Sequence, residues 1–122
     1  MRRPSILIVD DEKSIADTLA MIMQDAGYSA RAAYNGAAAL TLSREQAPDL
    51  VISDVLMPGM SGVDLAVTTK REFPSCRILL FSGQAASADM LRDARGRGYD
   101  FELLAKPIDP DELLQKLTAM FS

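Results

Sequence analysis

The sequence predicts an α/β protein with a doubly wound, five-stranded parallel sheet that is covered by helices on both faces. Strand-like apolar runs and helix-like segments alternate five times along the 122 residues. This alternation is typical of parallel sheets with helical crossovers. Polar residues also follow directly after four of the runs: Asp10, Asp11, Asp54, Ser82 and Lys106. The length is that of one domain, residues 1–122. Because ligands bind at the carboxyl ends of parallel strands, we expect the functional site at that edge of the sheet.

The first part of the chain supplies two strands and two helices. They are predicted as a strand over 6–9, a helix over 15–23, a weaker strand over 30–34 and a helix over 37–46. Apolar residues recur at helical spacing between Ile15 and Met23, and Gly27 is a suitable helix stop. Pro48 ends the alanine- and leucine-rich second helix.

The second part supplies three strands and three helices. The predicted strands are 50–54, 78–81 and 101–105. Ser61 and Asp64 form a plausible capping box for the third helix, and Asp109 followed by Pro110 marks the start of the fifth. The fourth helix, over 86–95, has a small apolar face made of Met90, Leu91 and Ala94. We therefore expect this helix to move or to face a partner.

Composition excludes several classes of protein. The formal net charge of −4 argues against a nucleic-acid partner, and no apolar stretch approaches the ~20 residues of a membrane span. Cys76 is the single cysteine, so a disulfide framework is absent and a cytoplasmic location is expected. The cluster Arg92, Arg95 and Arg97 is interpreted first as a solvated helix face and second as a docking patch.

Adjacent carboxylates after the first strand indicate a metal site. Asp10, Asp11 and Glu12 stand where the first helix begins, and helix capping explains one or two of them. Two carboxylates ~4 Å apart repel each other by roughly 4 kcal/mol at an effective dielectric near 20. Asp54 would add a third negative charge. Mg²⁺, which takes oxygen ligands, would relieve this repulsion.

The other polar positions are ordinary when taken singly. Asp54 could be a turn residue, Ser82 is followed by Gly83 as in many loops, and Lys106 precedes Pro107 in what could be a surface turn. A proline directly after a strand can also adopt the cis form. Their ordered appearance at successive strand ends favours a common pocket.

As a set, these residues resemble the response-regulator receiver domains of two-component signalling. The resemblance covers essentially the whole chain and rests on four groups of residues: Asp10-Asp11, Asp54 through Met57-Pro58 to Gly62, Ser82-Gly83 and Lys106-Pro107. It implies a flavodoxin-like fold with strand order 2-1-3-4-5. It also implies a single receiver domain with no output domain in this chain.

The resemblance assigns the metal and phosphoryl sites. Asp54 would be the phosphoacceptor. Mg²⁺ would be bound by the side chains of Asp11 and Asp54 and by the backbone carbonyl of Leu56, with Asp10 acting largely through metal-bound water. Such a protein is a phosphorylation-dependent switch and not an enzyme, apart from catalysing its own phosphoryl transfer and slow dephosphorylation.

Two further residues would read the phosphoryl group. Lys106 would pair with it, and Ser82 would hydrogen-bond it in the active state. Residue chemistry agrees, because a carboxylate can attack phosphorus directly and phosphoryl transfer depends on positioning and charge neutralisation.

Two departures from the family pattern stand out. Many receivers carry an aromatic residue three positions before the lysine, where this chain has Leu103, and Phe101 is a candidate substitute. Leu56 and Gln84 occupy the positions that tune water access. Apolar Leu56 predicts a phosphoryl group that survives well beyond seconds.

The resemblance also implies the partners. The phosphodonor would be a histidine kinase or a histidine phosphotransfer protein, since the chain contains no histidine. A downstream protein would bind the face around the fourth and fifth helices, and a phosphorylation-dependent dimer remains open.

Three rival functions fit less well. A haloacid-dehalogenase type of hydrolase requires a second acid where Leu56 stands. A flavodoxin-like cofactor binder requires a phosphate-binding loop where Asp10-Asp11-Glu12 would repel phosphate. A degenerate receiver that only binds proteins is disfavoured by the intact acidic set.

Overall fold

The predicted alternation of strands and helices is present. The computed structural model describes residues 3–83 and 87–121. Its elements are, in order, β1 (Ser5–Val9), α1 (Lys13–Asp25), β2 (Ser29–Ala33), α2 (Gly36–Glu45), β3 (Leu50–Asp54), α3 (Gly62–Glu72), β4 (Arg77–Ser82), α4 (Ser87–Gly96), β5 (Glu102–Ala105) and α5 (Pro110–Phe121).

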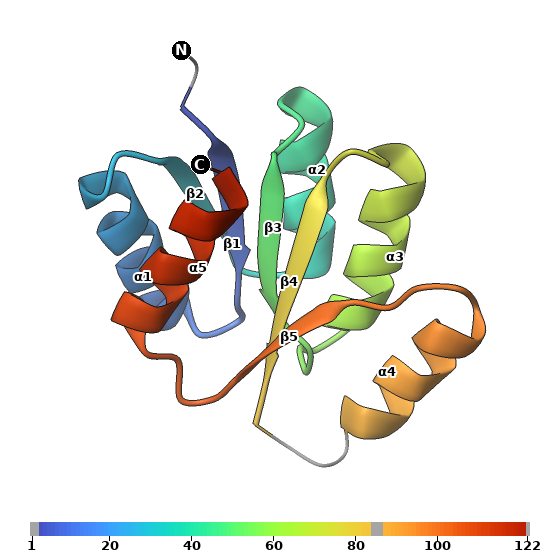
Figure 1. The fold of residues 1–122 in the computed structure, drawn as a ribbon. Helices are drawn as coiled ribbons and strands as arrows, with labels where there is room; N and C mark the ends of the chain where they lie inside the picture. Colours follow the sequence, from blue (N-terminus) through green and yellow to red (C-terminus); the bar gives the residue numbers. More distant parts are fainter. Residues whose placement is uncertain (1–2, 84–86, 122) are drawn as a thin grey trace.

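The five strands form one parallel sheet in the order β2-β1-β3-β4-β5. The helices α1 and α5 cover one face of the sheet, and α2, α3 and α4 lie on the other (Figure 1). These two sides are called below the α1/α5 face and the α2/α3/α4 face. The doubly wound class and the strand order expected from the sequence are therefore confirmed.

The apolar runs are continuous because both faces of the central strands are buried. In β1, Ile6 and Ile8 pack on the α1/α5 face, whereas Leu7 and Val9 pack on the α2/α3/α4 face. All four side chains are fully buried. The same alternation orders β3 and β4, so it fixes which face each residue near a strand end points towards.

Two predicted helix starts have the expected geometry. The Ser61 hydroxyl accepts a hydrogen bond from the Asp64 amide at 3.1 Å. The Asp109 carboxylate accepts one from the Asp111 amide at 2.9 Å. Each bond satisfies a backbone donor that the first turn of a helix leaves unpaired.

The helix α4 has the thin packing expected of it. Ala94 is buried, Leu91 is half-buried and Met90 remains 38% exposed. Its first expected residue, 86, lies outside the described residues. Arg92 pairs with Asp89 at 3.2 Å within this helix, and Arg97, directly after the helix, pairs with Asp93 at 3.4 Å. These pairs favour a solvated face as the meaning of the arginine cluster.

The strand β5 differs from the prediction at its start. The strand begins at Glu102, so Phe101 precedes it. Within the described part of the chain β5 pairs with β4 alone, so it is an edge strand. At this edge Leu103 is 46% exposed. None of the helices within residues 3–83 and 87–121 has the length and apolar character needed to cross a membrane.

Gly62 allows α3 to start against the end of β3. Its amide donates to the Val55 carbonyl at 2.8 Å, and a Cβ at this position would overlap with the carbonyl oxygen of Asp54. Any side chain would therefore displace the backbone that carries Asp54. By contrast, a Cβ at Gly96, the last residue of α4, would meet no atom within 4 Å.

We expect Gly62→Ala to destabilise the protein and Gly96→Ala not to. Gly62→Ala should lower the free energy of unfolding by at least about 1–3 kcal/mol, because the new methyl group has no space. Gly96→Ala should leave it unchanged or raise it by up to about 1 kcal/mol. Urea unfolding followed by circular dichroism measures both, and equal effects would contradict the close approach at Gly62.

Candidate functional site

Three carboxylates meet at the carboxyl ends of β1 and β3. Asp10 and Asp11 directly follow β1, and Asp54 is the last residue of β3, the neighbouring strand. One carboxylate oxygen from each lies within 4.8 Å of the others. The convergence predicted from the strand ends is present, and the cluster could hold a metal ion.

Asp10 is the most constrained of the three. It is 1% exposed, and its Oδ1 accepts a hydrogen bond from the Glu12 amide at 2.9 Å. Its Oδ2 is buried without a partner among the described residues. Capping therefore explains one oxygen of Asp10 and leaves the other unsatisfied.

The pKa of Asp10 lies above its ordinary value. Burial is the largest cause, and the charges of Asp54 and Asp11 add to it, while the Glu12 amide and Lys106 act in the opposite direction. A buried, unpaired carboxylate oxygen among other carboxylates is costly. A bound cation would remove that cost, so the residues present fit a divalent metal.

Lys106 balances part of this negative charge. Its Nζ donates to Asp54 Oδ2 at 2.8 Å and lies 5.3 Å from the centroid of the Phe81 ring. Burial lowers the pKa of Lys106, but the hydrogen bond to Asp54 and the nearby carboxylates outweigh it and raise this pKa. The Lys106–Pro107 peptide bond is cis, the form considered from the sequence.

Asp54 is held between two donors. It is 7% exposed, its Oδ2 is paired with Lys106, and its Oδ1 accepts from the Leu56 amide at 3.3 Å. Asp11, in contrast, is exposed. The site is therefore open on the Asp11 side and closed around Asp10.

Ser82 lies at the rim of the same site. It is the last residue of β4 and lines a cavity of about 190 Å³ together with residues at or just after the ends of β1, β3, β4 and β5: Asp11, Glu12, Asp54, Leu56, Gly83 and Lys106. Its hydroxyl forms a hydrogen bond with the hydroxyl of Ser87. The sequence did not indicate Ser87, because a serine at the start of a helix ordinarily suggests a cap.

Of the other positions noted in the sequence, Leu56 lies at the site and Phe101 lies away from it. Leu56 is half-buried and lines the site, whereas Gln84 lies outside the described residues. Phe101 stacks on Tyr99, with ring centroids 5.9 Å apart, and packs against the core of the α2/α3/α4 face. The predicted persistence of a phosphoryl group beside Leu56 stays a prediction.

Three carboxylates, an ammonium and a hydroxyl at one sheet edge can serve one kind of chemistry well. The carboxylates offer oxygen ligands to a hard divalent cation. The ammonium and the cation can neutralise the charge of a transferring phosphoryl group. The arrangement therefore suits phosphoryl transfer to a carboxylate.

Comparisons with known proteins agree with this chemistry. The profile of the family described as response regulator receiver domain matches residues 6–118. DNA-binding response regulator MtrA of Mycobacterium tuberculosis is 30% identical over 117 residues, covering 96% of this chain and 50% of MtrA. Transcriptional regulatory protein CreB of Escherichia coli is 29% identical over 120 residues, covering 98% of this chain and 52% of CreB. The chain thus spans about half the length of these curated relatives.

Solved structures show the same fold. Chemotaxis protein CheY4 of Vibrio cholerae matches with a TM-score of 0.84 and 28% identity, covering 97% of this chain and 98% of CheY4. NtrX from Brucella abortus matches with a TM-score of 0.82 and 29% identity over 97% of this chain, but over 26% of NtrX. The match therefore covers nearly all of one solved chain and about a quarter of a longer one.

We expect Asp10→Asn to stabilise the metal-free protein at neutral pH. The amide removes a buried negative charge and keeps the oxygen that accepts from Glu12, so the free energy of unfolding should rise by about 1–3 kcal/mol. The folded protein holds the Asp10 proton more tightly than the unfolded chain does. The wild type therefore gains stability as the pH falls through the folded pKa, and the advantage of the variant should vanish near pH ~4.

Urea unfolding in the presence of a chelator, repeated between about pH 4 and pH 7, measures this difference. Asp100→Asn, at an exposed aspartate outside the cluster, is the control and should stay within about 0.5 kcal/mol of wild type. A destabilised Asp10→Asn at neutral pH would contradict the electrostatic account.

Proposed function

The chain belongs to the response regulator receiver domain family, and on that premise we propose that Asp54 is the residue that accepts the phosphoryl group. The family match and the fold show that the chain is a phosphoacceptor receiver domain of two-component signalling. The observation that supports Asp54 is its position: it lies in the acidic cluster and is paired with Lys106 at 2.8 Å. Among residues 3–83 and 87–121, Asp10 Oδ2 has no such partner, and Asp11 is exposed.

The proposed transfer is a direct displacement at phosphorus. A carboxylate oxygen of Asp54 forms the new bond to phosphorus while the bond to the donor's leaving atom breaks. If the donor is a phosphohistidine, the imidazole nitrogen keeps the electron pair of that bond and takes up a proton. Little acid–base chemistry is needed, so positioning and charge neutralisation carry the reaction.

We assign the metal to Mg²⁺, held by Asp10, Asp11, Asp54 and the backbone carbonyl of Leu56. When bound, it would offset the repulsion among the carboxylates and the charge of the incoming phosphoryl group. The unsatisfied Oδ2 of Asp10 supports a cation in this cluster. Asp10, whose side chain is the most enclosed of the three, would contact the metal largely through hydrogen bonds to metal-bound water.

Lys106 and Ser82 are proposed to read the phosphoryl group. Lys106 would exchange its bond with the free Asp54 carboxylate for one with a phosphoryl oxygen. Ser82, at the rim of the same cavity, would donate its hydroxyl proton to another. Phosphorylation replaces the single negative charge of the Asp54 carboxylate with a phosphoryl group that carries about −1.5 to −2 charges and three acceptor oxygens, which these two donors can detect.

Receiver domains take phosphoryl groups from kinases, and we propose a histidine kinase or a histidine phosphotransfer protein as the donor. A downstream protein would bind the face around α4 and α5.

The comparisons do not support the expectation that nucleic acid is not a partner, because the relative MtrA is a DNA-binding regulator about twice as long as this chain. A cytoplasmic location and a single domain over residues 1–122 stay proposals, as does self-catalysed phosphoryl transfer.

Intact-protein mass spectrometry after incubation with acetyl phosphate tests the proposed function. Wild type should gain the mass of one phosphoryl group when Mg²⁺ is present and none when it is chelated. Asp54→Asn should gain none, because the amide is a poor nucleophile.

Asp64→Asn is the matched control, since Asp64 is exposed on the first turn of α3 and outside the cluster. It should be phosphorylated like wild type. A folded wild type that gains no mass with Mg²⁺ would overturn the proposal and favour a degenerate receiver that only binds proteins.

A further inference from the structure

The hydroxyl that would read the phosphoryl group is already bonded to another residue. Ser82 Oγ forms a hydrogen bond with Ser87 Oγ, and Ser87 is the first residue of α4. Ser87 is 2% exposed, so its hydroxyl is enclosed by protein. This bond joins the end of β4 directly to α4.

Strand alternation places Ser82 on the side of the sheet away from Asp54. Leu80, two residues before Ser82, packs on the α2/α3/α4 face, and Ser82 follows its alternation towards α4. Asp54 is paired in register with Phe81, which packs on the α1/α5 face, and Lys106 lies over the Phe81 ring. The acceptor and the lysine therefore share one side, and Ser82 begins on the other.

We propose that Ser87 withholds the Ser82 hydroxyl in the unphosphorylated domain, so that the phosphoryl group on Asp54 must take Ser82 from α4. A serine hydroxyl has one proton to donate, and its oxygen occupies one staggered position at a time. Turning towards Asp54 thus breaks the contact with Ser87. The inference rests on the proposed phosphorylation of Asp54 and makes Ser87 a positioning residue.

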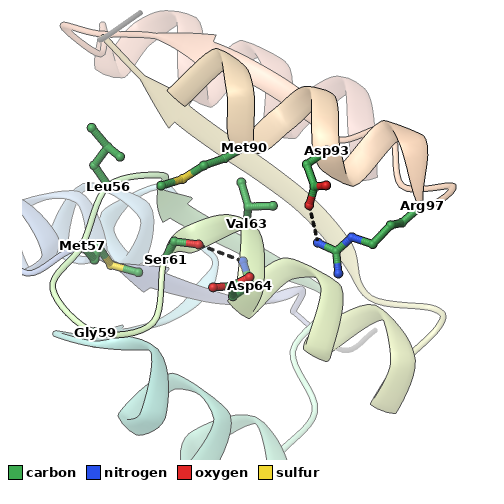
Figure 2. A pocket seen from close by; sticks show the side chains of 9 residues that line it. All are labelled: Leu56, Met57, Gly59, Ser61, Val63, Asp64, Met90, Asp93 and Arg97. Carbon is green, nitrogen blue, oxygen red and sulfur yellow. Dashed lines mark hydrogen bonds and ion pairs between the residues drawn. The ribbon is translucent and has the colours of Figure 1, made fainter. Parts of the chain in front are cut away.

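The helix α4 is weakly packed, so the loss of that bond can change its position or its opening. A cavity of about 240 Å³ separates α4 from the loop that follows β3 and from the start of α3 (Figure 2). Met90, Asp93 and Arg97 line one side, and the other side is lined by Leu56, Met57, Gly59, Ser61, Val63 and Asp64. Ala94 is the buried apolar anchor of the helix. Elements with few buried apolar contacts open most readily, so one bond at the first turn has weight here.

The aromatic residue that many receivers carry before the lysine is absent here, so a connection to α4 that does not use it is relevant. Leu103, which replaces the usual aromatic residue, is 46% exposed and has no ring to bury. Phe101 is half-buried, stacks on Tyr99 and packs against the core of the α2/α3/α4 face. The bond between Ser82 and Ser87 provides a direct connection from the phosphoryl site to α4 that needs neither residue.

A double-mutant cycle tests the inference, with beryllofluoride as the probe for a phosphoryl group on Asp54. Wild type, Ser82→Ala, Ser87→Ala and the double variant are titrated at saturating Mg²⁺ by isothermal calorimetry. Ser87→Ala should bind about threefold to tenfold more tightly than wild type, because the hydrogen bond between Ser82 and Ser87 no longer has to be broken. In the Ser82→Ala background the same substitution should change nothing.

Hydrogen exchange of α4 is the second measurement. In wild type, beryllofluoride should speed exchange in the first turn of α4, and in Ser87→Ala the exchange should already be fast without the ligand. Ser75→Ala, at an exposed serine before β4, is the control and should match wild type in both measurements.

Three outcomes would overturn the inference. They are unchanged or weaker binding by Ser87→Ala, equal tightening in both backgrounds, and α4 exchange that is the same in all four proteins. If wild type binds beryllofluoride and gains a phosphoryl group while the cycle shows no coupling, the role of Ser87 fails alone. If wild type does neither, the proposed function fails with it.

Discussion

The repulsion among three carboxylates at one sheet edge is the constraint on which the rest of the structure depends. Parallel strands bring Asp10, Asp11 and Asp54 to the same edge, and one oxygen of Asp10 is buried there without a partner among the described residues. Lys106 offsets part of the charge by pairing with Asp54. The cluster could therefore hold a cation, and a bound cation together with Lys106 would offset the negative charge of an incoming phosphoryl group.

The sheet also separates the parts of the site. Because side chains alternate between its faces, Asp54 and Lys106 meet on the side of α1 and α5, while Ser82 contacts α4 through Ser87. The proposed acceptor and the proposed sensor of the phosphoryl group thus start on opposite faces of the sheet. On the proposed route, Ser82 would turn its hydroxyl towards Asp54 without a large movement of the sheet. The loss of the bond to Ser87 would then let the weakly packed α4 change the surface that it presents.

Much of this was predictable from the sequence because the signals are local. Unbroken apolar runs marked strands buried on both faces, the polar residue after each run marked the site, and Ser61 and Asp109 marked helix starts that the structure confirms. Other features depend on contacts between distant segments. The contact of Ser82 with Ser87 has no sequence signature, and the exposure of Leu103 follows from its place at the sheet edge.

The most direct test of the account is to locate the phosphoryl group on the chain. After reaction with acetyl phosphate and Mg²⁺, borohydride reduces an aspartyl phosphate to homoserine, which tandem mass spectrometry of the digested protein assigns to one residue. The account predicts homoserine at Asp54 alone. Homoserine at Asp10, at Asp11 or at an aspartate outside the cluster would contradict it, because the pairing with Lys106 would then not mark the acceptor.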